Sequence, residues 1–233
     1  MAKKEDSFTS VMGTTDRIEL IATIVLAIAT ILTAWSAFES GKWSGEQAVS
    51  FSDAGAARTE STRADTRGGQ LSQIDVAMYI DWVTALNNEL LTGQITEQSL
   101  TPYIPTPRTI SGFLYTRFRS EFLPAVEAWL ATRPLVNDDA PKTPFTMPEY
   151  VVEQSVLADE LATLADEKST SARAANQNGD NYVLTMVLFA SVLFFAGVSA
   201  KMNDPRNRKF ALGFGVVLLV AGIGILTTLP ILV

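Results

Sequence analysis

The chain has 233 residues, a formal net charge of −7 at neutral pH, and neither cysteine nor histidine. Disulfides, thiolate metal sites, a Ser-His-Asp triad and imidazole ligands for haem, zinc or copper are therefore excluded. No remaining set of side chains is grouped as an active site would be, so we predict a non-enzymatic protein that uses no cofactor, metal or small-molecule substrate. The acidic character disfavours nucleic acid as a partner.

The first predicted element is a transmembrane helix at residues 18–38, after a tail at residues 1–17. Residues 20–38 carry no charge, and about 20 apolar residues suffice for a helix to cross the roughly 30 Å core of a bilayer. A cleaved signal peptide is the alternative, with Ala34, Trp35 and Ser36 as a weak cleavage site. The apolar run is longer than a signal peptide requires, and a polar tail precedes it, which favours a retained anchor.

Small side chains recur along this first span at alternating steps of four and three. They are Thr23, Ala27, Thr30, Ala34, Ala37 and Gly41, which we call the small-residue stripe. Such a stripe lets helix backbones approach closely in lipid, so it predicts tight packing within the chain or between copies in a homo-oligomer.

The alternative for the stripe is the wall of a cation pathway built from several copies. Glu39 would then form an acidic ring at its outer mouth, as charged rings do in cation channels. A surface salt bridge between Glu39 and Lys42 is the plainer interpretation of that carboxylate, and such pairs contribute about 0–1 kcal/mol.

The next segment, residues 39–181, is predicted to be an extracytoplasmic helical domain formed by a hairpin stalk with a small helical cap. The outgoing arm, residues 41–67, should stop at Gly68 and Gly69. The return arm should start near Thr146, with Glu149 completing the cap, and run to about residue 178. Its predicted coiled-coil seam contains Leu157, Leu161, Leu164, Lys168, Ser171, Ala175, Asn178 and Tyr182.

The cap is predicted to contain helices at residues 71–91 and 110–132, separated by a proline-containing loop. Pro124 predicts a kink or a restart within the second of these helices. Trp82, Phe118, Phe122 and Trp129 should form a small core. The alternative for these four aromatic side chains is an exposed surface that binds a partner.

Two further spans are predicted at residues 182–200 and 210–233, joined by a basic loop at residues 201–209. The basic side chains of that loop are Lys201, Arg206, Arg208 and Lys209. Basic residues in short loops mark the cytoplasmic side, whereas residues 39–181 contain 11 Lys/Arg against 20 Asp/Glu. We therefore predict a cytoplasmic N-terminus, which Lys3, Lys4 and Arg17 support, and an outward domain. The inverted orientation is the alternative, and contact with anionic lipid headgroups is the alternative role of the loop.

A segment around the end of the first span resembles a known group of sequences. Arg17, Ile18, Glu19 and Leu20 precede that span, and the runs Trp35-Ser36-Ala37-Phe38 and Trp43-Ser44-Gly45 follow one another at its end. This segment resembles a group of uncharacterised bacterial three-span inner-membrane proteins that carry a Trp-Ser-Ala-aromatic and a Trp-Ser-Gly segment after the first span. The resemblance implies a bacterial inner-membrane setting and assigns no functional residue.

The sequence as a whole predicts an all-α membrane protein that associates with itself. Its extracytoplasmic domain would act as a scaffold or as an interaction subunit for an envelope protein. The alternative function is a homo-oligomeric cation channel with the small-residue stripe along its path and Glu39 at its outer mouth.

Overall fold

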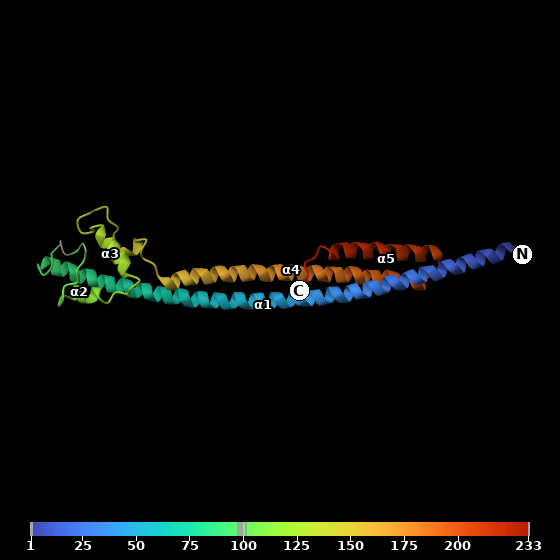
Figure 1. Ribbon diagram of the computed structural model, residues 1–233, viewed down its shortest axis with the longest axis horizontal. Coiled ribbons are helices and arrows are strands. Elements are labelled where there is room, and N and C mark those ends of the chain that lie inside the picture. The colour runs from blue at the N-terminus through green and yellow to red at the C-terminus, as the bar shows by residue number, and fades with distance from the viewer. Residues whose placement is uncertain (1, 97–99, 101, 233) are drawn as a thin grey trace. The chain divides into compact units, whose positions relative to one another are not determined.

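The computed structural model describes residues 2–96, 100 and 102–232, with side chains from residue 17 onward, and this part of the chain is helical without any strand. Its elements in chain order are α1 (Ala2–Leu91), α2 (Ile110–Tyr115), α3 (Leu123–Ala131), a 3-10 turn (Pro144–Thr146), α4 (Glu153–Lys201) and α5 (Pro205–Leu226), as Figure 1 shows. The predicted all-α class is confirmed. Lys3 and Lys4, which the orientation argument uses, lie outside the residues whose side chains are described.

Three of these helices, α1, α4 and α5, are long and apolar enough to cross a membrane. The chain divides into two compact units, to both of which α1 and α4 contribute. The membrane unit contains residues 1–53 and 167–233, and the second unit contains residues 54–166.

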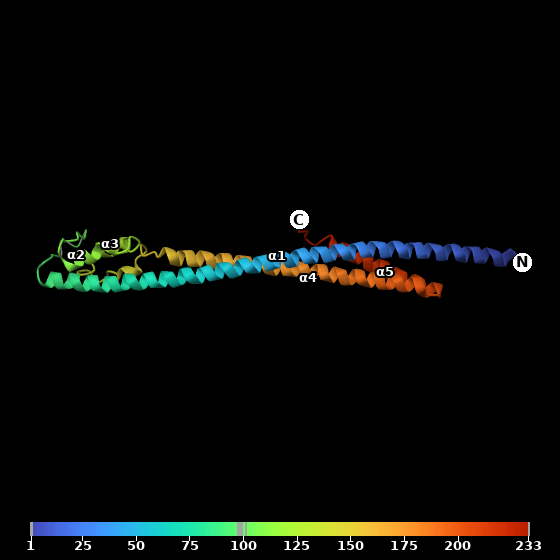
Figure 2. The ribbon, with the colours of Figure 1, turned by 90° about the horizontal axis from the view of Figure 1, so that it is seen from below.

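In the membrane unit, α1, α4 and α5 enclose one apolar core. Its buried members are Ala22, Val25 and Ala29 of α1, Phe189, Val192 and Ala196 of α4, and Leu212 and Leu219 of α5. Figures 1 and 2 show α5 running beside α4 in this unit. Glycine makes the contact close, because a Cβ on Gly222 would lie 2.7 Å from the ring of Phe189.

In the second unit, the four predicted core aromatics are all buried. Trp82 and Phe122 are fully enclosed and pack in one cluster with Phe118, Trp129 and the rings of several tyrosines. Residues 110–132 form two helices, and Pro124 lies in the first turn of the second, which confirms the predicted restart at this proline. Proline is suited to that position because the first turn needs no amide donor.

The predicted boundaries of the two long arms are wrong. Helix α1 continues through Gly68 and Gly69 to Leu91, and α4 begins at Glu153 rather than near Thr146. A Cβ on Gly68 would lie 2.5 Å from the Ser155 side chain and 3.2 Å from its backbone nitrogen. The glycine at position 68 therefore serves close approach of two helices and does not end one.

The predicted seam of the return arm is displaced by one helical row in the second unit, whereas Ala175 and Tyr182 in the membrane unit are buried as predicted. Within the second unit, Leu157 and Leu164 are exposed and Leu161 is half-buried, whereas Ala158 and Ala165 are buried. Their counterparts on α1 are Ala54, Ala57 and Ala64, all buried. In the membrane unit, Ser171 is exposed, Lys168 and Asn178 are half-buried, and Ala175 and Tyr182 are buried. Alanine and glycine occupy the contact because they allow the two helix backbones to lie closer together than leucine does.

The two adjacent glycines of α1 provide a matched test of this close packing. We expect Gly68→Leu to lower the free energy of unfolding by about 2 kcal/mol, because the added side chain must displace the backbone at Ser155. Gly69→Leu should raise that free energy by up to about 1 kcal/mol, because position 69 is open and leucine favours helix. Urea unfolding of the full chain in detergent, followed by tryptophan fluorescence, measures both. Equal effects at the two positions would contradict the packing described here.

Candidate functional site

The first span of α1 carries three rows of side chains with different surroundings. The row that faces the other two helices contains Ala22, Val25, Ala29, Ser36 and Glu39, all buried. A second row is bulky and exposed, with Ile21, Ile24, Ile28, Ile31, Trp35 and Phe38. The third row is the small-residue stripe, and each of its six members is exposed in the single chain. The structure thus places the stripe outside the packing with α4 and α5.

The hydroxyl groups of the stripe are satisfied inside their own helix. Thr23 donates to the carbonyl oxygen of Glu19 at 2.9 Å, and Thr30 donates to that of Leu26 at 2.8 Å. Because these donors are already used, the stripe can enter a dry contact without leaving a hydroxyl unpaired. It therefore offers a shallow surface on which another helix backbone can come close.

A polar cluster, which we call the clasp, joins the segment after α5 to α1 and α4 in the membrane unit. It contains Ser36, Glu39, Lys42 and Trp43 of α1, Tyr182 and Thr185 of α4, and the backbone of Pro230 and Leu232 after α5. The indole of Trp43 and the hydroxyl of Tyr182 both donate to the Pro230 carbonyl oxygen, at 3.2 and 3.1 Å. The hydroxyls of Ser36 and Thr185 are hydrogen-bonded at 2.9 Å.

Glu39 is the buried acid of this clasp and is only 1% exposed. Its carboxylate accepts a hydrogen bond from the Leu232 backbone nitrogen at 3.1 Å, and the Lys42 ammonium donates to the Leu232 carbonyl oxygen. The predicted salt bridge between Glu39 and Lys42 is not formed among the described residues; both side chains bind the same backbone segment instead. In the single chain the carboxylate thus faces protein and not open water, unlike an acid at a channel mouth.

The basic loop divides into one buried and three exposed cations. Arg208 is nearly buried, and its Nη2 lies 4.0 Å from a carboxylate oxygen of Glu19 on α1. Lys201, Arg206 and Lys209 are exposed. Asp204 caps α5 by accepting from the Arg206 backbone nitrogen at 3.0 Å. Arg208 therefore belongs to the contact between helices, and the other three remain free to meet lipid headgroups.

Two buried acids in the second unit were not singled out from the sequence. Asp75 accepts from Nε and Nη2 of Arg119 at 3.0 and 2.9 Å and from the Tyr150 hydroxyl at 3.2 Å. Hydrogen bonding to Asp75 raises the pKa of the Arg119 guanidinium. Glu89 accepts from the backbone nitrogen and the hydroxyl of Ser111. The signal that could have found both acids is their spacing, because they share one face of α1 with the core aromatics.

These acids fasten loops to α1 and do not gather into a metal site. No group of three or more acidic side chains that could hold a metal ion occurs among the described residues. Comparisons with protein-family models, with curated proteins and with solved structures find no match to the chain.

The clasp generates a prediction about the segment that follows α5. Glu39→Leu removes the acceptor of the Leu232 amide, and a hydrogen bond to a charged group contributes about 1.5–3 kcal/mol. We expect the exchange of that amide with solvent deuterium to become at least about tenfold faster. Glu39→Gln keeps an acceptor oxygen and should change the rate much less. Unchanged exchange in the leucine variant would show that Glu39 does not hold this segment.

Proposed function

We propose that this protein is a non-enzymatic integral membrane protein that associates with itself through the small-residue stripe of its first span. The single observation that carries the proposal is the segregation of side chains on α1. Bulky residues and small residues form separate exposed rows, although neither row is needed to pack α4 or α5. Lipid chains accommodate bulky aliphatic side chains, whereas a row of small ones favours a second helix.

The part of the chain between the first and second spans would then act as a scaffold or as an interaction subunit for an envelope protein. We propose a bacterial inner membrane, with the N-terminus in the cytoplasm and this part outside it. The exposed cations Lys201, at the end of α4, and Arg206 and Lys209, near the start of α5, flank the short connection between the two helices and support that orientation. The resemblance of the segment around Trp35 and Trp43 supports the bacterial setting.

The second candidate function, a homo-oligomeric cation channel, uses the same exposed stripe. It would require Glu39 to leave the clasp and face a water-filled path, because its carboxylate is enclosed in the single chain. The stripe hydroxyls also already donate within α1. These two observations favour a contact between copies over a pore.

The stripe is tested by enlarging two of its members. We expect the double variant Ala27→Leu/Ala34→Leu to associate at least about tenfold more weakly in vesicles, because each added side chain pushes the helices apart. The control, Ile24→Leu/Ile31→Leu, changes the neighbouring bulky row and should associate normally. Energy transfer between donor-labelled and acceptor-labelled copies measures both.

Equal association of the two double variants would show that the stripe is not the contact. Purified protein in planar bilayers should be electrically silent. A cation current that Glu39→Gln alters would contradict the scaffold function and support the channel function.

The proposed orientation has its own test. The chain contains no cysteine, so Asp138→Cys introduces a single thiol on an exposed residue of the second unit. We expect a membrane-impermeant maleimide to label it in intact cells. Lys209→Cys, in the basic loop, serves as the control and should react only after the cells are opened. The reverse pattern would establish the inverted orientation.

A further inference from the structure

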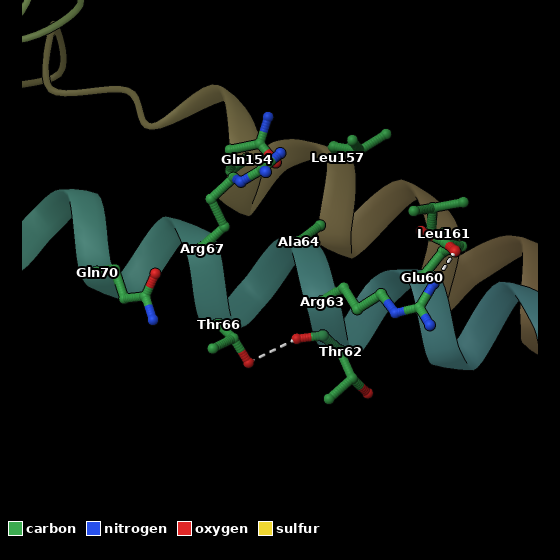
Figure 3. A pocket seen from close by; sticks show the side chains of 10 residues that line it. All are labelled: Glu60, Thr62, Arg63, Ala64, Thr66, Arg67, Gln70, Gln154, Leu157 and Leu161. Carbon is green, nitrogen blue, oxygen red and sulfur yellow. Dashed lines mark hydrogen bonds and ion pairs between the residues drawn. The ribbon is translucent and has the colours of Figure 1, made fainter.

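A groove with an apolar floor runs between α1 and α4 in the second unit. Its volume is about 600 Å³. Figure 3 shows Leu157 and Leu161 of α4 with Ala64 of α1 along it, and Arg63 and Arg67 of α1 at its edge. The groove is therefore a surface on which apolar contact and charge occur together.

Leu157 and Leu161, which line this groove, and Leu164, one step further along α4, lie beside the buried row that α4 packs against α1. Leu157 and Leu164 are each 41% exposed, while the buried row beside them consists of Ala158 and Ala165. Leu157, Leu161 and Leu164 follow steps of four and three, which is the seam spacing of a coiled coil. A partly exposed row with this spacing offers a surface on which a second helix can pack.

The charges beside the leucines identify that helix. On α4, Glu153 and Glu160 lie seven residues apart on the side of the leucine row away from Ala158, and both are exposed. In the part of the chain that the structure describes, neither acid nor Arg67 forms an ion pair. Arg63 pairs only with Glu60 on its own exposed helix face. The surface thus has an acidic edge on α4, whereas its edge on α1 carries Arg67 together with the Arg63–Glu60 pair.

The charged residues at the two edges also lie at matching positions along the helix axes. Ser61 donates to the Ala158 carbonyl oxygen at 2.8 Å, and Gly68 lies against Ser155. Because α1 and α4 are antiparallel, Glu160 lies at the level of Arg63, and Glu153 lies at the level of Arg67. Copies inserted in one membrane with one orientation have parallel α4 helices, so a two-fold axis keeps these levels in register.

We propose that a second copy of the chain occupies this groove as a parallel, two-fold symmetric pair. Leu157, Leu161 and Leu164 of one copy meet the same leucines of the other. On each α4, the acids lie on one flank of the leucine row and α1 lies on the other flank. The two-fold axis therefore brings the acids of one copy close to α1 of the partner, as flanking charges approach each other in parallel coiled coils. Glu153 and Glu160 of one copy thereby face Arg67 and Arg63 of the other. The proposal rests on the proposed self-association and names a second surface for it.

The absence of native cysteine allows a direct test on the full chain in vesicles. On a two-fold axis Leu164 meets its own counterpart, so we expect Leu164→Cys to form a covalent dimer with a short bis-maleimide. Thr163→Cys is the matched control, because it is exposed and adjacent but lies off the seam. We expect the seam cysteine to link at least about tenfold faster than the control. Copies with two different affinity tags show that the product contains two molecules of this chain.

A charge exchange tests the register. Arg67→Glu, added to Leu164→Cys, places two acids together across the pair and should slow linking about tenfold. Arg67→Glu combined with Glu153→Arg restores opposite charges and should restore the rate. A merely unfolded variant would not be rescued by a second substitution, so rescue distinguishes contact from misfolding.

Three results overturn the proposal, and they differ in what else they affect. If Leu164→Cys links no faster than Thr163→Cys while energy transfer between copies persists, the groove is empty and the stripe still associates. If the two cysteine variants link equally and energy transfer between copies is also absent, both this proposal and the proposed self-association are wrong. If Leu164→Cys in cell membranes links to a different protein and not to its own copy, the groove belongs to that partner.

Discussion

Close packing between small side chains is the constraint on which the structure depends. In the second unit, Ala57 and Ala64 of α1 and Ala158 and Ala165 of α4 form the buried rows, and Gly68 lets Ser155 come near. In the membrane unit, Ala22, Ala29 and Ala196 contribute to the core, and Gly222 accommodates Phe189. Small residues bury little apolar area each, so such rows stabilise chiefly through many close dispersion contacts.

Close packing of small side chains is supplemented by polar groups that hold non-helical segments against the helices. It also determines which side chains remain on the outer faces. The clasp around Glu39 and the buried Asp75–Arg119 pair each tie a non-helical segment to α1. Small residues fill many of the inner positions of α1 and α4, while isoleucines of the first span and leucines of α4 lie on outer faces. The exposed apolar rows are thus a consequence of how the helices pack within one copy.

The buried acids of the described residues serve structural contacts. The buried acids are bound by backbone amides, hydroxyls or an arginine, and each holds a loop or a chain segment in place. The stripe and the leucine groove are two separate surfaces that we propose for contact between copies.

The sequence predicted the helical class, the three apolar helices and the aromatic core around Trp82, because charge-free length and helical spacing are local properties. The sequence did not predict which of two neighbouring rows of side chains on a helix faces the other helices. Ala22, Val25 and Ala29 follow the same kind of spacing as Thr23, Ala27 and Thr30, and small residues occupy both rows. For the same reason, Ala158 is buried in the contact with α1, where the sequence predicted Leu157. The partner of Glu39 could not be predicted, since Leu232 lies far away in the chain.

The central claim is that the first span separates a face for lipid from a face for protein. A nitroxide scan of residues 20–41 in vesicles, with oxygen accessibility measured at each position, tests it most directly. The account predicts high accessibility at Ile24, Ile28 and Ile31. Thr23, Ala27 and Ala34 should be protected nearly as well as the buried row. Equal oxygen accessibility at the small and the bulky positions would show that the stripe faces lipid, and would contradict the account.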